Sequence, residues 1–268
     1  MIHVAVLPDL VDTVGGPNRT WGIESCRVIV VDTLRASTTI ITALENGARA
    51  VVPVSSIPEA FTEAGRRGAG QVLLAGERGG VRIDRFDLGN SPSEFSPRHV
   101  HGKTVIMATS NGTGAIRHCA DARSVAIGSL LNARSVAENH VTSVGAEPSQ
   151  GQDRAIIVCA GTEGEVSQDD LIGAGSIVDQ MLALNAELDL DDAGLSALDL
   201  YLAHRKDVEG ALARTAHGRR LLSLGFREDV TRAAQLHSST IVPMLRDGEI
   251  RIDSNSPGPG QAPADTGT

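Results

Sequence analysis

The chain has 268 residues and a formal net charge of −9, and 41% of its residues are hydrophobic although only 2% are aromatic. This length allows a sizeable core, and we expect one α/β domain over residues 1–253. The excess negative charge repels a phosphate backbone, so nucleic-acid binding is not expected. An interior built from Val, Ile, Leu and Ala is typical of parallel strands covered by helices.

The three cysteines argue against a disulfide framework, because they include no C-x-x-C pair and leave one cysteine over. They indicate a reducing compartment. The N-terminus lacks a basic start followed by an apolar stretch, and no apolar run is long enough to cross a bilayer. We therefore expect a cytoplasmic protein that has no membrane partner.

In chain order, short hydrophobic runs alternate with segments of helical spacing. We expect strands at 27–32, 50–54, 72–74, 103–108, 124–127 and 155–159, and helices at 36–46, 58–67, 111–120, 133–140 and 168–184. A polar loop is expected at 141–153, and Ser167 with Asp170 resembles a capping pair. The alternation predicts a layered α/β/α fold with a mixed, largely parallel sheet.

The C-terminal part is expected to cover this sheet. Residues 193–236 have helical spacing with breaks at Gly210, Gly218 and Gly225, and residues 240–244 resemble a last strand. Residues 254–268 are too rich in Pro, Gly and small polar residues to pack against a core. We predict that they form a disordered tail.

The first candidate site follows the strand at 27–32. Asp32 ends this strand, Arg35 lies in the turn, and the hydroxyls of Ser37 and Thr38 open the next helix. A carboxylate for a metal, a guanidinium for phosphate and hydroxyls at a helix start suit a phosphoryl site. The alternative is that Asp32 or Ser37 only caps the helix and that Arg35 is a surface charge.

A glycine-rich segment at 76–92 is the second candidate. Glu77 and Arg78 come right after a predicted strand, and Asn90 and Ser91 precede a helix start at Pro92. Long glycine-bearing loops inside compact domains are often functional, although residues 87–91 can also form a simple turn.

The third candidate is the TSNGTG segment at 109–114. Its small residues allow backbone N–H groups near Asn111, Gly112 and Thr113 to converge on an oxyanion. A tight turn around Asn-Gly is the alternative. Ligands of open α/β sheets bind beyond the carboxyl ends of the strands, so all three segments can face one anion pocket.

Other reactive residues are weaker candidates. Cys159 can act as a nucleophile or be a core residue, and Asp169 and Asp170 can bind a metal or complement a helix dipole. The histidines lack zinc-site spacing and are expected at the surface. The sequence also lacks a P-loop, a G-x-G-x-x-G after a strand and a G-x-S-x-G elbow.

The motifs taken together resemble one family. VVDTLRASTTIITALENGA, LLAGERGG, FDLGNSPSEF, TSNGTGAI and IVCAG occur in this order between residues 30 and 161, and the later segment GRRLLSLGFREDVTRAAQLHSSTIVPML fits as well. The chain thus resembles the 2-phosphosulfolactate phosphatases. This resemblance implies a Mg²⁺-dependent hydrolase that converts (2R)-phosphosulfolactate to sulfolactate and phosphate, a step of coenzyme M biosynthesis.

This function assigns roles to the candidate residues. Mg²⁺ would be held by carboxylates from Asp32, Glu77 and Asp170, while Arg35, Arg78 and the N–H groups near Gly112 would stabilise the phosphate oxygens. Water is the simplest nucleophile, with Asp32 or Cys159 as alternatives. Two rival functions stay open: a phosphatase of broad specificity on 2-phospho acids, and a binding protein without turnover. A homo-oligomer is also compatible with the sequence.

Overall fold

The computed structural model describes residues 1–17, 19–68, 70–146 and 154–253. The predicted tail at 254–268 and most of the predicted loop at 141–153 lie outside these residues. The described part of the chain contains no helix long and apolar enough to span a membrane.

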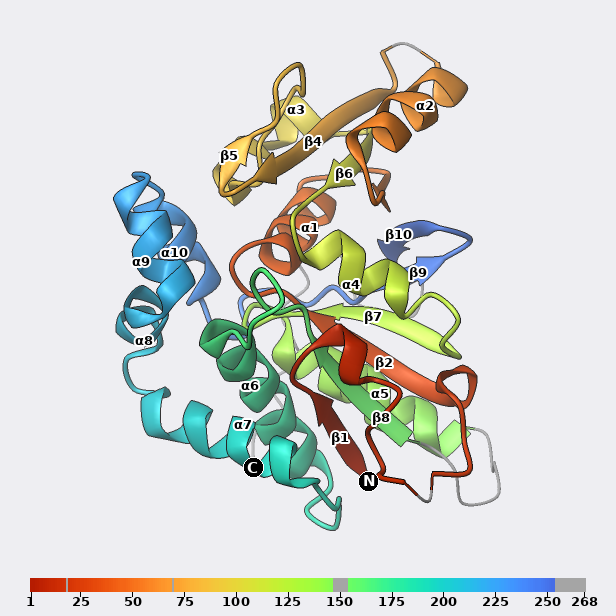
Figure 1. Cartoon of the computed structure of the whole chain (residues 1–268), viewed down its shortest axis with the longest axis vertical. Helices are drawn as coiled ribbons and strands as arrows, with labels where there is room; N and C mark the ends of the chain where they lie inside the picture. Colours follow the sequence, from red (N-terminus) through yellow and green to blue (C-terminus); the bar gives the residue numbers. More distant parts are fainter. Residues whose placement is uncertain (18, 69, 147–153, 254–268) are drawn as a thin grey trace.

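One twisted sheet of ten strands organises the described residues (Figure 1). Its strand order is β1 (Ile2–Ala5), β8 (Arg154–Cys159), β2 (Cys26–Val31), β7 (Ser124–Gly128), β9 (Pro243–Arg246), β10 (Glu249–Ile252), β3 (Ala50–Pro53), β6 (Thr104–Ala108), β4 (Val72–Arg78) and β5 (Val81–Arg82). Five neighbouring pairs are parallel and four are antiparallel. The predicted mixed, largely parallel sheet is confirmed.

The hairpin of β9 and β10 divides the sheet into two halves. It pairs antiparallel with β7 on one side and with β3 on the other, so β3, β6 and β4 run opposite to β2, β7 and β8. Twist of about 20–25° per strand accumulates across these steps and curls the sheet. The carboxyl ends of β2 and β6 consequently meet, and Gly112 lies against Asp32.

Helices cover both faces of the curled sheet. Helices α1 (Ala36–Glu45) and α4 (Gly112–His118) lie between the two halves, as Figure 1 shows. Helices α5 (Ala133–Ala146), α6 (Gln168–Leu184) and α7 (Asp192–His204) cover the outer face of the first half, and α2 (Ile57–Arg67) covers that of the second.

Strand β2 shows how alternation produces these layers. Val28 and Val30 face the inner core with α1 and α4, whereas Ile29 and Val31 face the outer core with α5 and α6. Successive side chains of a strand point to opposite faces, and β2 is buried on both. Its continuous apolar run is therefore what a strand between two helical layers requires.

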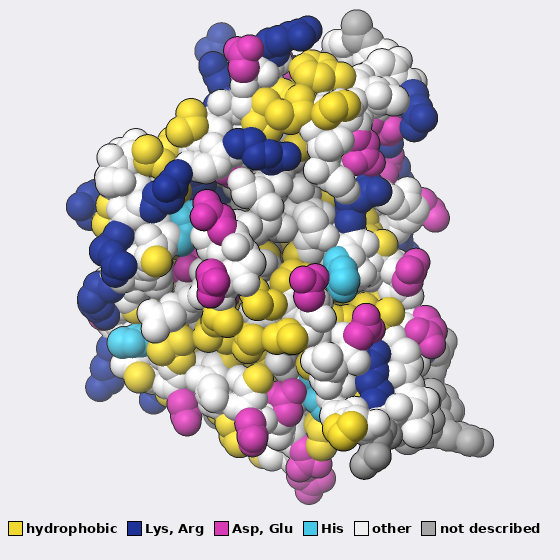
Figure 2. All heavy atoms as spheres, viewed as in Figure 1, with side chains coloured by type: hydrophobic (Ala, Val, Ile, Leu, Met, Phe, Trp, Pro, Cys, Tyr) yellow, Lys and Arg dark blue, Asp and Glu magenta, His cyan; other side chains and the backbone are white. Residues whose placement is uncertain are grey.

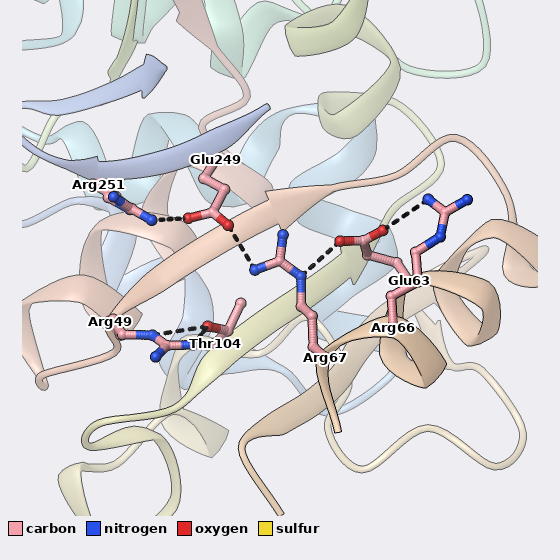
Figure 3. Close-up of polar contacts among 7 residues, drawn as sticks. All are labelled: Arg49, Glu63, Arg66, Arg67, Thr104, Glu249 and Arg251. Carbon is pink, nitrogen blue, oxygen red and sulfur yellow. Dashed lines mark hydrogen bonds and ion pairs between the residues drawn. The ribbon is translucent and has the colours of Figure 1, made fainter. Parts of the chain in front are cut away.

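An ion-pair network ties α2 to the hairpin (Figure 3). Arg67 of α2 donates to Glu63 and to Glu249 of β10, both at 2.6 Å, and Arg251 pairs with the other oxygen of Glu249. Nearby, the Arg49 guanidinium donates to the Thr104 hydroxyl at 3.0 Å. The Arg67–Glu249 pair therefore links α2 to the inserted hairpin.

Several predicted elements differ from the structure. Helix α5 continues to residue 146, so residues 141–146 are helical and not a loop. Gly210 and Gly218 lie inside α8 (Val208–Arg214) and α9 (Ala216–Ser223); among the three expected breaks, only Gly225 separates two helices, α9 and α10 (Arg227–Ala233). Strand β1 and strand β10 were not predicted, and β9 begins three residues later than the last strand expected at 240–244.

Candidate active site

The turn between β2 and α1 holds Asp32 in a fixed position. Its backbone N–H donates to Ser37 Oγ at 2.9 Å, its backbone carbonyl accepts from the Ser37 N–H at 2.9 Å, and its Oδ1 accepts from the Ala36 N–H at 3.1 Å. Asp32 thus satisfies N–H groups at the start of α1, as the capping alternative expected. The side chain is nevertheless buried, at 6% exposure.

Gly112, the first residue of α4, lies directly beside the second carboxylate oxygen. A Cβ atom at this position would come within 2.5 Å of Asp32 Oδ2 and 2.6 Å of the Ala36 Cβ. Only glycine lets the two chain segments approach this closely. Within the TSNGTG segment, Gly112 therefore contributes to the site because it has no side chain.

The first turn of α6 adds two more buried carboxylates. Asp170 Oδ1 accepts from the Thr33 N–H at 2.8 Å and its Oδ2 accepts from the Gly161 N–H at 2.9 Å, so this side chain joins the β2 and β8 turns. Asp169 accepts from the Ser167 hydroxyl at 2.6 Å. The predicted Ser167–Asp170 capping pair does not form, since Ser167 makes no side-chain cap.

Negative charge is crowded at these turns. Burial, together with the charges of Asp169 and Glu77, raises the pKa of Asp32 to about 7, although the Ala36 N–H and Arg35 oppose the shift. Burial also raises the pKa of Asp170 well above its ordinary value, and Asp169 and Asp32 add to this effect. The site therefore favours a ligand that supplies positive charge.

The β4–β5 hairpin brings Glu77 into this group. Strand β4 continues through Arg78, and Gly79 and Gly80 form a two-residue turn with φ values of 59° and 86°. Positive φ at both positions is typical of type I′ hairpins, and glycine adopts it readily. Glu77 Oε2 accepts from the Gly80 N–H and Oε1 accepts from the Ser110 N–H, both at 2.7 Å.

Arg35 is a buried connector and not a surface charge. Its Nη1 donates to Asp229 of α10 at 2.7 Å, its Nη2 donates to the Gly80 carbonyl at 3.0 Å, and its guanidinium stacks on Phe226. Asp229 also accepts from the Ser91 hydroxyl at 2.6 Å. Arg35 therefore joins the β2 turn, the β4–β5 turn and α10.

Helix α9 contributes a histidine and a second arginine. Burial is the main cause that lowers the pKa of His217; Arg35 and Arg220 act in the same direction, while Asp169 and Glu77 oppose them. The His217 Nδ1 lies 3.4 Å from the Thr162 hydroxyl in the β8 turn. Arg220 donates through Nη2 to the Gly79 carbonyl at 2.8 Å. The expectation that all histidines lie at the surface is wrong, because His217 is part of this site and His3 is buried.

The remaining predicted binding residues mostly serve the fold in this structure. The Thr38 hydroxyl donates to the Thr33 carbonyl, Thr113 exchanges hydrogen bonds with Thr109, and Asn111 accepts from the Glu163 N–H. Arg78 is exposed, with Nη1 bound to the Glu77 carbonyl. Asn90 is buried, and its Oδ1 has no hydrogen-bond partner within the described residues. Phosphate binding by these side chains stays a prediction.

Two further expectations concern the metal and the nucleophile. Within the residues that the structure describes, no three His, Cys, Asp or Glu side chains are arranged to hold a metal ion. Metal binding by Asp32, Glu77 and Asp170 therefore stays a prediction. Burial, with the charges of Asp170 and Asp169, raises the pKa of Cys159 well above its ordinary value, so the thiol is not an activated nucleophile.

Three residues of the site were not predicted from the sequence: His217, Arg220 and Asp229. They lie in the segment GRRLLSLGFREDV or just before it, where no local motif marks a ligand-binding residue. Asp169 was a candidate together with Asp170, and only packing separates their roles. Gly79 and Gly80 directly after a predicted strand are a recognisable sequence signal for the β4–β5 hairpin.

The fold and this site define an α/β protein that holds crowded carboxylates against arginines at the ends of its strands. The chain belongs to the 2-phosphosulpholactate phosphatase family, whose sequence profile matches residues 17–248. The resemblance inferred from the motifs is thereby confirmed.

Three relatives illustrate the match, and each is named a probable 2-phosphosulfolactate phosphatase. The protein of Deinococcus radiodurans is 42% identical over 222 residues, which cover 82% of this chain and 88% of the relative. The Caldanaerobacter subterraneus protein is 39% identical over 233 residues, covering 87% and 93%. The Carboxydothermus hydrogenoformans protein is 36% identical over 247 residues, covering 91% and 98%.

Proposed function

We propose that this chain is a phosphoric monoester hydrolase that releases phosphate from 2-phosphosulfolactate. The observation that carries the proposal is the meeting of the turns after β2, β4, β6 and β8, where Gly112 lies against Asp32 and the Ser110 N–H donates to Glu77. Asp169, Arg35 and His217 lie close enough to influence these carboxylates electrostatically. Family membership supplies the substrate, because the relatives are named for it.

We include Mg²⁺ in this proposal, because the donor atoms fit it. Mg²⁺ prefers carboxylate oxygens and usually keeps several waters, so one or two carboxylates are sufficient. Both oxygens of Glu77 and of Asp170 already accept backbone N–H groups. Asp32 and Asp169 are better placed as ligands, since within the described residues each accepts a hydrogen bond at only one oxygen, from the Ala36 N–H and from the Ser167 hydroxyl respectively. Bound there, Mg²⁺ would offset the crowded negative charge and polarise a phosphate oxygen.

The chain's own residues position the reaction. A water oxygen forms a bond to phosphorus, the bond from phosphorus to the ester oxygen breaks, and the ester oxygen takes up a proton. Phosphoryl transfer of this kind depends on positioning and charge more than on covalent help. The hydrogen bonds that Asp32 makes with Ala36 and Ser37 fix its position, and His217 of α9 lies beside the Thr162 hydroxyl of the β8 turn.

The test is phosphate release from (2R)-phosphosulfolactate, from 2-phospholactate and from an aryl phosphate, each with Mg²⁺ and with EDTA. We expect release that depends on Mg²⁺ and is fastest with phosphosulfolactate. Equal rates on both 2-phospho acids would establish the broad phosphatase instead. Binding without release from any substrate would leave the non-catalytic binding protein.

The metal is tested separately by calorimetric titration of Mg²⁺ into the wild type and the Asp169→Asn variant. We expect binding to the wild type and weaker binding to the variant. Equal binding to both would contradict the role of Asp169.

A further inference from the structure

Helix α9 carries positive charge to the edge of this site. Figure 2 shows Lys and Arg side chains gathered along the edge of the molecule formed by α8, α9 and α10. This stretch is basic although the whole chain has a net charge of −9. A ligand with several anionic groups would be drawn to this side of the site.

Arg220 is the arginine of α9 that reaches the β4–β5 turn. Its Nε and Nη2 donate to the Gly79 carbonyl at 3.3 and 2.8 Å, while Arg35 donates to the carbonyl of the adjacent Gly80. A Cβ atom at Gly79 would lie 3.0 Å from Arg220 Nη2, so this glycine allows the close approach. The two guanidinium groups therefore donate hydrogen bonds to adjacent carbonyl groups of one turn.

These two arginines differ in what they can offer a ligand. The Arg35 side chain is 2% exposed and forms an ion pair with an equally buried Asp229 at 2.7 Å, so its charge is already neutralised. Arg220 is exposed and uses N–H groups on a neutral carbonyl. Within the described residues no Asp or Glu forms an ion pair with Arg220. Its remaining donors can bind an anion in two-point fashion.

Helix α9 is also held firmly enough to position such a group. Thr215 caps it by accepting from the Gly218 N–H at 2.9 Å, and a Cβ atom at Gly218 would lie only 1.9 Å from the Leu212 carbonyl oxygen. His217, one turn before Arg220, contacts Thr162 of the β8 turn. Arg220 is thus fixed relative to both turns that frame the carboxylates.

We infer that Arg220 determines substrate specificity by binding the sulfonate of the substrate. The inference rests on the proposed function, and it names the group that the site recognises besides phosphate. In 2-phosphosulfolactate the carboxylate is bonded directly to the carbon that bears the phosphate ester, whereas the sulfonate is one carbon further away. With the phosphate at the carboxylate cluster, the sulfonate is the anionic group that can reach furthest from it, and we assign it to the exposed Arg220.

The test compares Arg220→Ala with Arg219→Ala on the same three phosphate esters. Arg219 is the adjacent arginine on α9, also exposed, and it donates to the Arg214 carbonyl. For Arg220→Ala we expect the KM for phosphosulfolactate to rise about 10- to 100-fold, since a charged hydrogen-bonded contact is lost. The loss should be selective: kcat/KM for 2-phospholactate and for the aryl phosphate should fall at least about 10-fold less than kcat/KM for phosphosulfolactate. Arg219→Ala should behave as the wild type, and Arg220→Lys should recover part of the loss.

Two outcomes would overturn the inference. An equal rise in KM for phosphosulfolactate and for 2-phospholactate would show that Arg220 binds the carboxylate and not the sulfonate. An unchanged KM for phosphosulfolactate would show that Arg220 does not bind the substrate.

Calorimetric binding of sulfolactate and of lactate separates this inference from the proposed function. If the wild type releases no phosphate but binds sulfolactate more tightly than lactate, and Arg220→Ala abolishes the difference, the recognition stands and the hydrolase proposal fails. If the wild type hydrolyses the ester and Arg220→Ala binds sulfolactate normally, the hydrolase proposal stands and the recognition fails.

Discussion

Two charged regions of this molecule follow opposite rules. In the network of Figure 3, each carboxylate is matched by arginines, and the ion pairs with Arg67 and Arg251 outweigh burial and lower the pKa of Glu249. At the ends of β2 and β8, carboxylates lie among carboxylates, and the pKa values of Asp32 and Asp170 are raised. One region balances its charge internally, and the other leaves negative charge for a ligand to balance.

The difference separates structural from functional charge. A balanced surface network adds modest stability and needs nothing else. A buried, unbalanced cluster costs stability, so a fold that retains one requires a compensating use for it. The four predictions that follow test this distinction, beginning with the ion pair of Arg35 and Asp229, which is buried like the carboxylate cluster but balanced like the network.

The largest effect is expected on folding when Asp229 is replaced by alanine. Arg35 would then remain buried without its partner, which costs about 3–5 kcal/mol. Denaturant unfolding of Asp229→Ala measures this loss. Asp12→Ala is the control, because Asp12 is 76% exposed and lies 3.8 Å from its partner Arg19; it should change stability by less than about 1 kcal/mol. A loss that small for Asp229→Ala would show that the buried pair does not hold the site together.

Replacement of Asp32 by asparagine should separate activity from stability. The amide oxygen can still accept from the Ala36 N–H, so the turn should persist, while the loss of charge should lower phosphate release by about 100- to 1,000-fold. Thermal unfolding should occur at the same or a higher temperature, because one member of the crowded carboxylates is neutralised. The exposed Asp84→Asn serves as the control. Near-normal turnover in Asp32→Asn would remove Asp32 from the chemistry.

A single methyl group next to Asp32 should have a smaller effect of the same kind. In Gly112→Ala the new Cβ atom would have to move Asp32 Oδ2 from 2.5 Å to an ordinary contact distance. Small displacements of a catalytic group cost activity, and we expect kcat to fall about 10- to 100-fold. Gly114→Ala on the same helix is the matched control, because its Cβ atom meets nothing within 4 Å. If both variants keep full activity, the position of Asp32 is not critical.

The same comparison shows what could be predicted from the sequence. Strand-helix alternation was sufficient for the fold class, and the polar residues that follow the strands lie at the turns where the buried carboxylates gather. The prediction placed these turns together because carboxyl ends of parallel strands lie at one edge of an open sheet. The structure instead reverses direction at the β9–β10 hairpin and brings Asp32 and Gly112 together by curling. The turns do meet, but the curling of the sheet brings them together as well as the parallel strand order.

The roles of individual side chains were harder to predict, because they depend on packing between distant segments. Arg35 lies in the turn where a phosphate ligand is expected, yet its partner Asp229 is 194 residues away along the chain. Asp169 and Asp170 are neighbours in sequence, and only the backbone N–H groups of Thr33 and Gly161 determine which of them is bound to the two turns. Local patterns carry no information about such long-range contacts.

The smallest predicted effect lies in the balanced network, where Glu249→Gln removes two ion pairs at the surface. Because the pKa of Glu249 is lowered in the folded protein, its contribution to stability is present above the ordinary glutamate pKa of about 4.3 and is lost as pH falls through the folded value. The wild type should therefore be more stable than Glu249→Gln by about 0.5–1 kcal/mol at pH 7, and the gap should close near pH 3. Denaturant unfolding at both pH values measures it, with phosphate release at pH 7 unchanged. A gap that widens toward low pH would show that Glu249 is not stabilised as a carboxylate, and the contrast between the two regions would not hold.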